Sequence, residues 1–503
     1  MLYLLYREKR PDKKSQGKGE MMDMLKKNQE VTLRIDDLGN NGEGIGHMDG
    51  YALFVKGALP GETIRAKTMK CKKNYGFAKM TEILQSVDAG RVEPKCPVAG
   101  KCGGCTLQHL AYEKQLAYKQ KKVMECLVRL GGVDKETVEW LPIYGMDEPW
   151  HYRNKAQFPI RMQKDEWGEN RPVSGFYVGR THNIIPVTDC VIQHPCMKEI
   201  LELVLSWMQE QRVPAYDEEN HSGLVRHIYI RHAHYTGQIM VCLVLNSREL
   251  HPEQRKALVA RLTQIQGVAS IFLNINTKQT NVILGEEMDL LWGEQYIEDR
   301  IGDIRYHISP QSFYQVNPVQ TEKLYQTVLE FAELSGGETV WDLYCGIGTI
   351  SLFLAGGAKK VYGVEIVPEA IQNARKNACL NGIGNVEFAC GPAEEIVPKM
   401  AEKIRSTGNL MAEEENGGVD RTSLADVVVV DPPRKGCDGA LLDTIGEMAP
   451  DKIVYVSCDP ATLARDVKVL GERGYRVNKV RAVDMFGQGG HVESVCLLHR
   501  RDS

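Results

Sequence analysis

The sequence predicts an α/β protein built from three folded parts, of which the C-terminal part is a doubly wound, Rossmann-like parallel sheet. From about Thr321 to the end, short apolar segments typical of buried strands alternate regularly with segments of helical periodicity. Residues 31–87 instead show short alternating segments separated by Gly, Asp and Asn, the pattern of a small β-barrel. Residues 150–302 mix strand-like and helix-like segments, which indicates an α+β region with a central sheet.

These patterns divide the chain of 503 residues into four segments. We expect a disordered basic tail over residues 1–28, an OB-like β-barrel over 29–87, a central α+β domain over 88–310 and the doubly wound domain over 311–503. Three folded domains suit a chain of this length, since a domain takes roughly 150 residues.

The composition is that of an ordinary globular protein, with 43% hydrophobic and 25% charged residues. The net charge of −4 excludes a uniformly basic nucleic-acid binder, so any nucleic-acid surface must be a local patch. No apolar run approaches the roughly 18 residues of a membrane helix. The start of the chain is apolar first and basic second, the reverse of a signal peptide. We therefore expect a cytoplasmic protein that does not bind a membrane.

One basic patch lies in the predicted barrel. Between Thr63 and Met80 the chain has six Lys or Arg residues and no acid, with Tyr75 and Phe77 among them. Such a segment is either a solvated strand face or a groove in which cations meet phosphates and rings stack on bases.

The first strand of the predicted doubly wound sheet, residues 340–343, runs into a glycine-containing turn at 344–348. Glycine lets the backbone approach a ligand at the carboxyl end of that strand. The dinucleotide fingerprint has a third glycine where Ser351 stands here, which disfavours a nicotinamide or flavin cofactor. Glu365 lies seventeen positions after Gly348 and ends the next strand, where a carboxylate can accept both ribose hydroxyls of a nucleoside.

Two later strands end in residues that could carry chemistry. The strand 427–430 runs into Asp431 and two prolines, which force the chain out at the carboxyl edge of the sheet. The strand 453–457 ends at Cys458, just before Asp-Pro. A cysteine is often only a small buried hydrophobe, but this position faces the ligand crevice, where a thiolate can act as a nucleophile.

Glu493 lies just before the last apolar strand and is our candidate for a general base. His491, two positions earlier, is the rival, because an unperturbed imidazole titrates near neutral pH. The simpler interpretation of Glu493 is an exposed residue at the start of a strand.

Three cysteines, Cys96, Cys102 and Cys105, lie within ten residues, and two glycines separate the last two. The tight spacing favours a metal over disulfides, because the backbone must fold around one centre. Four thiolates suit zinc or an iron–sulfur cluster, and the residues alone do not choose between these metals. Four further cysteines compete to be the fourth ligand: Cys190, Cys196, Cys71 and Cys126.

Together these motifs resemble the RNA uracil-5-methyltransferases, most closely the bacterial subgroup that acts on 23S ribosomal RNA. The resemblance covers roughly residues 31–498. It is most specific in three segments: Asp-Leu-Tyr-Cys-Gly-Ile-Gly-Thr at 342–349, Asp-Pro-Pro-Arg-Lys-Gly at 431–436 and Ser-Cys-Asp-Pro-Ala-Thr-Leu-Ala-Arg-Asp at 457–466. The predicted barrel resembles a TRAM domain, which implies that its basic patch binds RNA.

The resemblance implies S-adenosylmethionine as the methyl donor and a covalent mechanism. The thiolate of Cys458 would add to carbon 6 of uracil, carbon 5 would take the methyl group, and Glu493 would remove the proton from carbon 5. The cofactor ligands implied by the resemblance are Gln315, Tyr344, Glu365 and Asp431. The implied ligands of a 4Fe-4S cluster, placed away from the methyl transfer, are Cys96, Cys102, Cys105 and Cys190.

The chain departs from the family pattern in one place near the predicted base. The family usually has Phe-Pro-x-Thr before the closing His-x-Glu, whereas residues 486–490 are Phe-Gly-Gln-Gly-Gly. The loop that leads to Glu493 could therefore lie differently here. Ribosomal RNA is the expected partner, and no protein partner is implied.

Three alternatives stay open. A transfer-RNA uracil-5-methyltransferase would share the active-site motifs, although the barrel and the cysteines favour ribosomal RNA because the bacterial transfer-RNA enzymes of this family generally lack both. Methylation of a base amino group can use an Asp-Pro-Pro segment but needs no nucleophilic cysteine. A non-catalytic RNA-binding iron–sulfur protein would have no use for Cys458, Glu493 and a complete cofactor loop.

Overall fold

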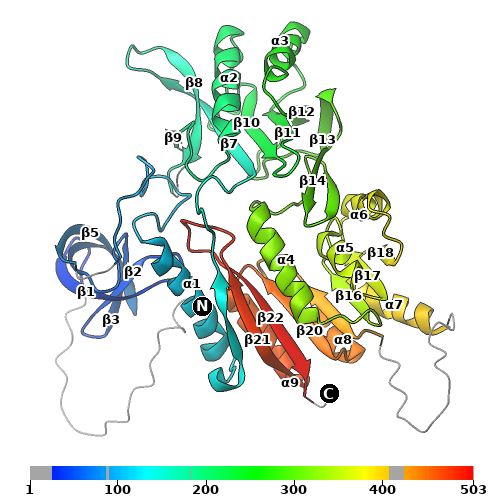
Figure 1. Cartoon of the computed structure of the whole chain (residues 1–503). Coiled ribbons are helices and arrows are strands. Elements are labelled where there is room, and N and C mark those ends of the chain that lie inside the picture. The colour runs from blue at the N-terminus through cyan, green and yellow to red at the C-terminus, as the bar shows by residue number, and fades with distance from the viewer. Residues whose placement is uncertain (1–24, 87–89, 180, 182, 407–423, 502–503) are drawn as a thin grey trace, which may run out of the picture.

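The structure, a computed structural model, describes residues 25–86, 90–179, 181, 183–406 and 424–501. Figure 1 shows three parts: a blue barrel at the left, a green sheet with two helices at the top, and a larger sheet with several helices below it. The predicted basic tail lies outside the described residues except for residues 25–28.

Five strands close the N-terminal barrel in the order β1-β2-β3-β5-β4, and β1 pairs antiparallel with both β2 and β4. In β1 the buried Val31, Leu33 and Ile35 alternate with exposed residues, as expected of a strand with one face in a core. The barrel predicted from the sequence is confirmed. Its strands are β1 (Glu30–Leu38), β2 (Gly44–Met48), β3 (Tyr51–Lys56), β4 (Thr63–Cys71) and β5 (Tyr75–Gln85).

The seven-stranded central sheet has the order β13-β12-β11-β10-β7-β8-β9, and helices α2 and α3 cover one of its faces. Strand β11 is buried along its whole length, because its other face packs against the C-terminal part of the chain. The elements of this region are β7 (Lys155–Lys164), β8 (Asn170–Tyr177), β9 (Ile184–Pro186), α2 (Cys196–Glu210), β10 (Val225–His232), β11 (Ile239–Leu245), α3 (Pro252–Leu262), β12 (Val268–Ile275), β13 (Glu287–Gly293) and the hairpin β14 (Ile297–Ile301) with β15 (Ile304–Ile308).

The eight-stranded C-terminal sheet has the order β18-β17-β16-β19-β20-β22-β21-β6. The strands from β18 to β20 in this order run parallel, and β22 runs antiparallel between β20 and β21. The predicted Rossmann-like sheet is confirmed. Its elements are α4 (Pro318–Ala332), β16 (Thr339–Leu343), α5 (Thr349–Ala355), β17 (Lys360–Glu365), α6 (Pro368–Leu380), β18 (Val386–Cys390), α7 (Ala393–Ser406), β19 (Val427–Val430), α8 (Gly439–Met448), β20 (Lys452–Ser457), α9 (Pro460–Glu472), β21 (Tyr475–Val483) and β22 (Glu493–Arg500).

The C-terminal sheet also takes residues from the segment that we assigned to the central domain. Strand β6 (Glu139–Tyr144) pairs parallel with β21 at the edge of the sheet. Helix α1 (Tyr112–Arg129) places Val123 and Leu127 in the same core as Leu463 of α9. Strand β6 covers β21, which would otherwise be an edge strand. No local sequence pattern indicates this pairing, and the expected domain boundary at residue 310 does not include β6 and α1 in the C-terminal domain.

Two cores lie on opposite faces of the C-terminal sheet. Helices α4, α5 and α6 cover one face, and α1, α7, α8 and α9 cover the other. Strand β19 supplies Val427 and Val429 to the first core and Val428 and Val430 to the second. The first core continues through the β14–β15 hairpin to the central sheet, so the two sheets share packed side chains.

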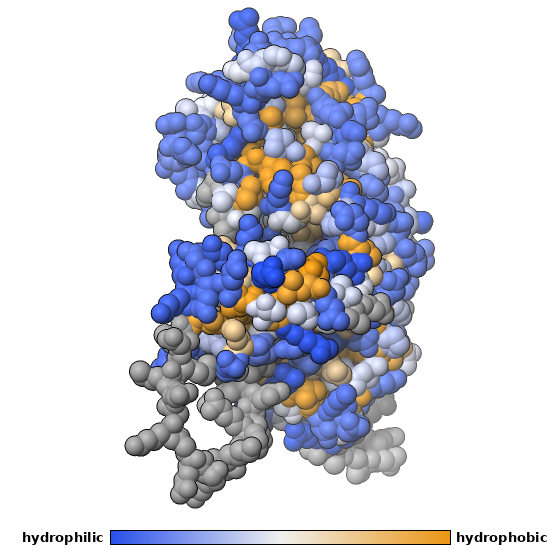
Figure 2. Space-filling model, turned by 90° about the vertical axis from the view of Figure 1, so that its left-hand side faces the viewer, coloured by the Kyte–Doolittle hydropathy of each residue, from blue (hydrophilic) through white to orange (hydrophobic). Residues whose placement is uncertain are grey.

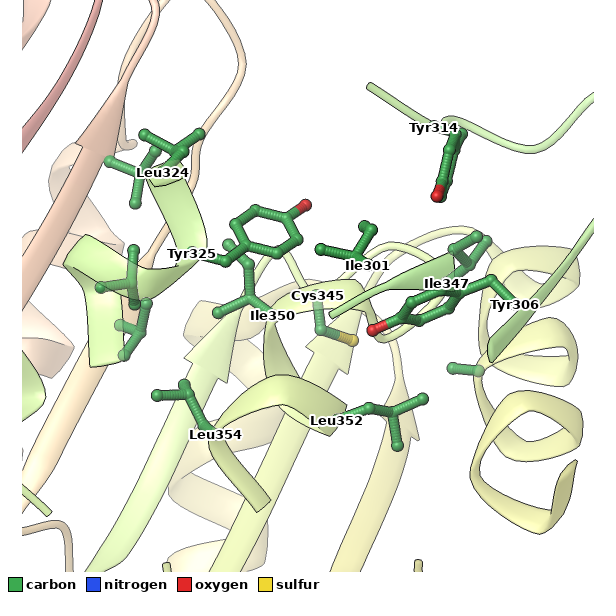
Figure 3. Close-up of a cluster of buried hydrophobic side chains, with 14 of the residues drawn as sticks. Ile301, Tyr306, Tyr314, Leu324, Tyr325, Cys345, Ile347, Ile350, Leu352 and Leu354 are labelled. Carbon is green, nitrogen blue, oxygen red and sulfur yellow. The ribbon is translucent and has the colours of Figure 1, made fainter. Parts of the chain in front are cut away.

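Figure 3 shows part of that shared core, in which Tyr306, Tyr314 and Tyr325 lie around Cys345 and Ile347. Figure 2 shows the face of the molecule that carries the barrel, where hydrophobic surface gathers towards the middle. In the described part of the chain, no helix is long and apolar enough to cross a membrane.

Candidate active site

Two candidate site residues follow neighbouring strands at the carboxyl edge of the parallel sheet. Strands β19 and β20 pair in parallel with Val430 opposite Tyr455. Asp431 comes directly after β19, and Cys458 comes directly after β20. Both residues therefore emerge at the edge where open α/β sheets bind their ligands.

Strand β22 brings Glu493 to the same place from the other side of β20. The antiparallel register sets Ser457 of β20 opposite Ser494 of β22. The next position beyond Ser457 is Cys458, and the position before Ser494 is Glu493. Residues opposite each other in an antiparallel pair project to the same face, with Cβ atoms about 4.5–5.5 Å apart. The thiol and the carboxyl group are thus placed side by side.

Cys458 lies in a short turn that is fixed by hydrogen bonds on both sides. The backbone N–H of Asp459 donates to Ser457 Oγ at 3.1 Å. The carboxylate of Asp459 caps helix α9 by accepting from the backbone N–H groups of Ala461 and Thr462, at 2.9 and 3.2 Å. Cys458 itself is half-buried. The turn therefore holds a partly accessible thiol in a defined position.

The acids around Cys458 disfavour its thiolate in the free protein. The pKa of Cys458 is raised to about 11, first by burial and then by the nearby Glu493 and Asp431, whereas Arg434 opposes the rise. Burial also raises the pKa of Glu493 to about 8, again with a contribution from Asp431 and opposition from Arg434. Positive charge near the site would therefore favour the thiolate that the sequence analysis expects as the nucleophile.

A third carboxyl group belongs to this buried set. Burial raises the pKa of Asp342, on β16, to about 7, and its Oδ2 accepts a hydrogen bond from Ser351 Oγ. Its Oδ1 is buried without a hydrogen-bond partner among the described residues. Asp342, Asp431 and Glu493 all act on the pKa of Tyr325, which is buried on α4. The three acids therefore lie close to one another in a low-dielectric space.

The turn after β16 is anchored to the neighbouring strand. Tyr344 has a positive φ of 73°, and its N–H and that of Cys345 both donate to the carbonyl of Val364, at 2.9 and 3.0 Å. Half-buried Glu365, at the end of β17, accepts from Gly346 N–H at 3.2 Å and from Val367 N–H at 2.9 Å. Tyr344 and Glu365 are thus fixed at adjacent strand ends, one beyond β16 and one on β17.

Gln315 lies in the segment between β15 and α4, which is held by its backbone. Asn154 donates from Nδ2 to the carbonyl of Gln315 at 3.0 Å, and its N–H donates to the carbonyl of Val316 at 2.9 Å. Asn373 of α6 reaches Ser312 Oγ at 3.4 Å, which ties the segment to the helix that follows Glu365. The half-buried side chain of Gln315 remains a predicted ligand.

The four cysteines of the predicted cluster site line one cavity of about 310 Å³. Cys96 and Cys102 act on the pKa of both Cys105 and Cys190, so the four thiols lie near one another. The three rival fourth ligands lie elsewhere: Cys71 on β4, Cys126 on α1 and Cys196 at the start of α2. Among the described residues, no group of three or more His, Cys, Asp or Glu side chains is arranged to hold a metal ion.

The loop that precedes Glu493, residues 484–491, begins at a buried ion pair. Lys119 Nζ of α1 lies 2.5 Å from Asp484 Oδ1, and neither side chain is exposed. Tyr112 donates to the other carboxylate oxygen at 2.7 Å, and Lys119 also donates to the carbonyl of Phe486 at 2.9 Å. Burial lowers the pKa of Lys119, and Asp484 opposes that shift. Helix α1 therefore fixes the start of the loop.

The middle of the 484–491 loop is held by a pair of amides. Gln115 Nε2 donates to Gln488 Oε1, and Gln488 N–H donates to Gln115 Oε1, each at 3.1 Å. The carbonyl of Gln488 accepts from Thr106 and Leu107 N–H, each at 3.0 Å. These two residues directly follow Cys105. The loop thus connects the cysteine segment to the strand that carries Glu493.

The end of the loop touches the barrel. Lys122 Nζ donates to the carbonyl of Gly490 and to that of Asn40, each at 2.9 Å, and Asn40 lies between β1 and β2. Tyr152 donates to the carbonyl of Gly487 at 3.1 Å. The glycine-rich sequence that departs from the expected Phe-Pro-x-Thr is therefore the place where all parts of the molecule meet.

Comparison with known families shows the family of the chain. The family model described as tRNA (Uracil-5-)-methyltransferase matches residues 111–501, and the model of the TRAM domain matches residues 25–81. The chain belongs to the tRNA (uracil-5-)-methyltransferase family. It is an S-adenosylmethionine-dependent RNA (uracil-5-)-methyltransferase, and its barrel is a TRAM domain.

The curated relatives of this methyltransferase match it along nearly its whole length. An uncharacterized RNA methyltransferase of Halalkalibacterium halodurans is 49% identical over 480 residues, which are 95% of this chain and 98% of that protein. A second, from Clostridium acetobutylicum, is 48% identical over 478 residues, 95% of this chain and 98% of that protein. Their names give the class of reaction but no RNA target.

A solved structure is similar across most of the methyltransferase. It is the Pyrococcus abyssi tRNA (uracil-54, C5)-methyltransferase in complex with S-adenosyl-L-homocysteine, with a TM-score of 0.69 and 27% identity. The match covers 93% of this chain and 99% of that one.

The structure brings the predicted nucleophile, base and acid of the methyltransferase together at one sheet edge, with the cofactor loop on the neighbouring strands. It keeps the predicted cluster ligands together in a separate cavity, whose wall includes His491 of the 484–491 loop. Sequence reasoning missed Asp342, Arg434 and Tyr325 as members of the active site. Asp342 and Arg434 lie inside motifs that the sequence analysis quotes, so their positions could have indicated a role. No sequence feature marks Tyr325.

Proposed function

We propose that this methyltransferase methylates carbon 5 of a uridine in 23S ribosomal RNA, with Cys458 as the nucleophile and Glu493 as the base. The observation that supports it most directly is that Cys458 and Glu493 lie just beyond the paired Ser457 and Ser494 at the carboxyl edge of the sheet, close enough for Glu493 to act on the pKa of Cys458. A thiol and a carboxyl group side by side suit a reaction that adds sulfur to one carbon of a ring and removes a proton from the next.

The residues at the edge fit S-adenosylmethionine. Glu365 is oriented by two backbone N–H groups and can accept the ribose hydroxyls, and Tyr344 begins the turn after β16, the strand next to β17. Burial raises the pKa of Asp342 and of Asp431 to about 7, and the positive charge of a sulfonium nearby would favour their carboxylates. When bound, S-adenosylmethionine supplies an electrophilic methyl group.

The chain's own residues carry the covalent steps. The sulfur of Cys458 bonds to carbon 6 of uracil, and the electron pair of the carbon 5–carbon 6 double bond becomes available at carbon 5. After carbon 5 has gained its methyl group, Glu493 takes the proton from that carbon. The electrons of the C–H bond restore the double bond, and the carbon 6–sulfur bond breaks to release the thiolate.

Burial gives Glu493 a pKa that suits its proposed role. A carboxylate with a pKa of about 8 is a stronger base than an exposed one, while still ionised in part near neutral pH. Arg434 opposes the pKa rise of both Cys458 and Glu493, so it favours the two anions that the reaction requires. For the rival base His491, burial lowers the pKa, and Arg434 lowers it further.

We also propose that Cys96, Cys102, Cys105 and Cys190 hold a 4Fe-4S cluster. A single tetrahedral ion would draw four sulfurs to about 2.3 Å from one point, and no described group stands that way. Four thiols around a shared cavity instead suit a cluster, in which each sulfur binds a different iron. Burial, and to a lesser degree the other thiols, raise the pKa of Cys105 and Cys190, and positive iron would favour their thiolates.

Transfer RNA is the second candidate substrate, because the similar solved structure is named a tRNA (uracil-54, C5)-methyltransferase. That match covers 93% of this chain, so overall architecture does not separate the two substrates. We favour ribosomal RNA because the chain combines the TRAM domain with the cysteine segment, as the ribosomal-RNA subgroup of the resemblance does.

The decisive experiment uses 5-fluorouridine in unmodified 23S ribosomal RNA and in unmodified transfer RNA. Fluorine replaces the proton that Glu493 must remove, so the covalent adduct cannot resolve. We expect a stable protein–RNA adduct through Cys458 with ribosomal RNA and S-adenosylmethionine. An adduct with transfer RNA alone would reassign the substrate, and methylation without any adduct would overturn the covalent mechanism.

A further inference from the structure

A second cavity, of about 290 Å³, plays no part in the mechanism proposed above. Its walls come from the connection between β6 and β7, from the end of β10 and its following turn, and from the start of α4. We call it the histidine cavity, because four imidazoles line it: His151, His194, His232 and His234.

Two of the histidines form a flat, stacked pair. The rings of His194 and His232 are stacked with centroids 3.6 Å apart and planes 13° from parallel. Burial lowers the pKa of His232 to about 4, and it lowers the pKa of His194 in the same direction. Both rings are therefore neutral near neutral pH. His151 and His234 are exposed and stand towards the mouth of the cavity.

These rings do not present a metal site. His194 Nδ1 lies 3.1 Å from Cys196 Sγ and accepts from the backbone N–H of Cys196 at 3.4 Å. His151 Nδ1 is engaged with the carbonyl of Gln193 at 2.9 Å. Stacked rings cannot both aim a nitrogen at one ion, and the described residues include no set of three suitable ligands.

Hydrogen bonds connect the cavity to the segment that carries Gln315. Buried Asn154, in its wall, holds the carbonyls of Gln315 and Val316, and its own carbonyl accepts from His232 N–H at 2.8 Å. The amide of Asn154 thus joins the histidine stack to a predicted cofactor ligand.

The cavity also lies within reach of the active site. Asn317, in its wall, caps helix α4, and Tyr325 stands eight residues further along that helix beside the three buried acids. Eight residues of α-helix span about 12 Å. Tyr152 and Arg153 line both this cavity and the cysteine cavity, and Arg153 Nε is buried without a hydrogen-bond partner among the residues described.

We propose that the histidine cavity binds an unpaired base of the RNA substrate, from a nucleotide close to the target uridine. The inference rests on the proposed function, since it assumes an RNA whose uridine reaches Cys458. Neutral stacked rings suit the face of a base, and the nearby Trp150 adds a further aromatic surface. Arg153 is a cationic side chain in the wall, and the exposed Asp147 and Glu148 there oppose the binding of a phosphate.

The test is photo-crosslinking with the full-length enzyme. The probe is in vitro transcribed 23S ribosomal RNA sparsely doped with 4-thiouridine, with transfer RNA doped in the same way as the second substrate. We expect crosslinked peptides that contain residues 146–154 or 231–235. Crosslinks confined to the TRAM domain and the Cys458 region would overturn the proposal.

Variants make the test quantitative. His232→Ala removes one ring of the stack and should weaken RNA binding about 5- to 100-fold, the range for loss of one base–aromatic contact. His232→Phe keeps a flat ring and should lose less. His251→Ala, at the start of α3 and outside the cavity, is the matched control. If His232→Ala binds RNA as tightly as the wild type does, the proposal is overturned. If that variant also loses the ability to bind zinc, the histidines form a metal site instead.

The 5-fluorouridine adduct, measured on the same preparation, separates this inference from the proposed function. An adduct at Cys458 without crosslinks to the histidine cavity refutes only the proposal that this cavity binds a base. Crosslinks to the cavity without any adduct would retain the base site and refute the covalent mechanism. The absence of both would refute both.

Discussion

Cys458 directly follows β20 and Glu493 is the first residue of the neighbouring antiparallel strand β22, so both lie just beyond the Ser457–Ser494 pair. Burial raises the pKa of both groups, Asp431 raises both as well, and Glu493 also raises the pKa of Cys458. The proposed reaction nevertheless requires a thiolate and then a carboxylate at these positions. The site therefore depends on positive charge, from Arg434 and from the bound sulfonium, to allow either anion to form.

Cys458→Ala should abolish methylation and the 5-fluorouridine adduct, because no other group supplies the sulfur that activates carbon 5. The affinity for S-adenosylmethionine, measured by calorimetry, should change little, since Cys458 is not among the proposed cofactor ligands. Cys379→Ala, which removes an exposed thiol on α6, is the control and should behave as wild type. An adduct formed by Cys458→Ala would show that another cysteine is the nucleophile.

Glu493→Gln should accumulate a covalent adduct with ordinary uridine RNA, because the carbon 5 proton cannot leave. General-base loss slows such a step by about 10²- to 10⁴-fold. The adduct is read as a slowly migrating band in denaturing electrophoresis. His491→Gln is the comparison, and accumulation in that variant, with free RNA in Glu493→Gln, would transfer the base role to His491.

The two steps should depend differently on pH in the wild-type enzyme. Adduct formation should rise throughout pH 6–9, because the pKa of Cys458 is raised to about 11 and the thiolate fraction grows with pH. Adduct resolution should instead level off near pH 8, where Glu493 becomes ionised. Rapid-quench measurement of both steps tests this, and a resolution rate independent of pH between 6 and 8 would contradict it.

The buried acids should also make the folded enzyme less stable as pH rises. Their pKa values are raised in the folded state, so between about pH 5 and 8 the folded chain binds more protons than the unfolded chain, and stability falls with pH. One such group contributes at most about 1.4 kcal/mol per pH unit. Urea unfolding of the cofactor-free enzyme should show a shallower pH slope for Glu493→Gln than for wild type. Glu472→Gln, at an exposed position on α9, should keep the wild-type slope.

Removal of one partner of the buried ion pair should destabilise the fold strongly. Lys119→Met leaves Asp484 charged in a site without solvent, and we expect a loss of about 3–5 kcal/mol in urea unfolding. The double variant Lys119→Met with Asp484→Asn removes the uncompensated charge and should recover part of this loss. A cost of Lys119→Met below about 1 kcal/mol, typical of surface pairs, would show that the pair is hydrated in solution.

Iron analysis should identify the fourth cluster ligand. Cys190→Ser should lose iron and the visible absorption of an iron–sulfur centre, whereas Cys196→Ser should retain both, because only Cys190 lines the cavity with the other three thiols. The proteins must be purified without oxygen. Full iron content in Cys190→Ser would place the fourth ligand elsewhere.

Much of this architecture could be predicted because its signals are local in the sequence. Alternating residues in β1, parallel strand patterns after residue 321 and strand-end motifs at Asp431 and Cys458 each lie within a few positions of the feature that they predict. The closed barrel and the Rossmann-like sheet followed from these patterns.

What the sequence could not predict depends on contacts between distant segments. Strand β6 joins β21 across more than 300 positions of the chain, and no local pattern marks that pairing. The same holds for Gln115 and Gln488, which are 373 positions apart. Tyr325 carries no motif, and its place beside the acids is known only once α4 is packed on the sheet.

The 484–491 loop has a consequence for protein engineering. Lys122 of α1 links Gly490 of this loop to Asn40 of the TRAM domain, and the loop's own hydrogen bonds reach Gln115 of α1 and Thr106 of the cysteine segment. The loop ends two residues before Glu493. Chimeras that exchange the TRAM domain or the cysteine segment between homologues will thus lose matching contacts at this interface, unless the loop and α1 are exchanged together with them. RNA selectivity and turnover will not be separable by simple module exchange.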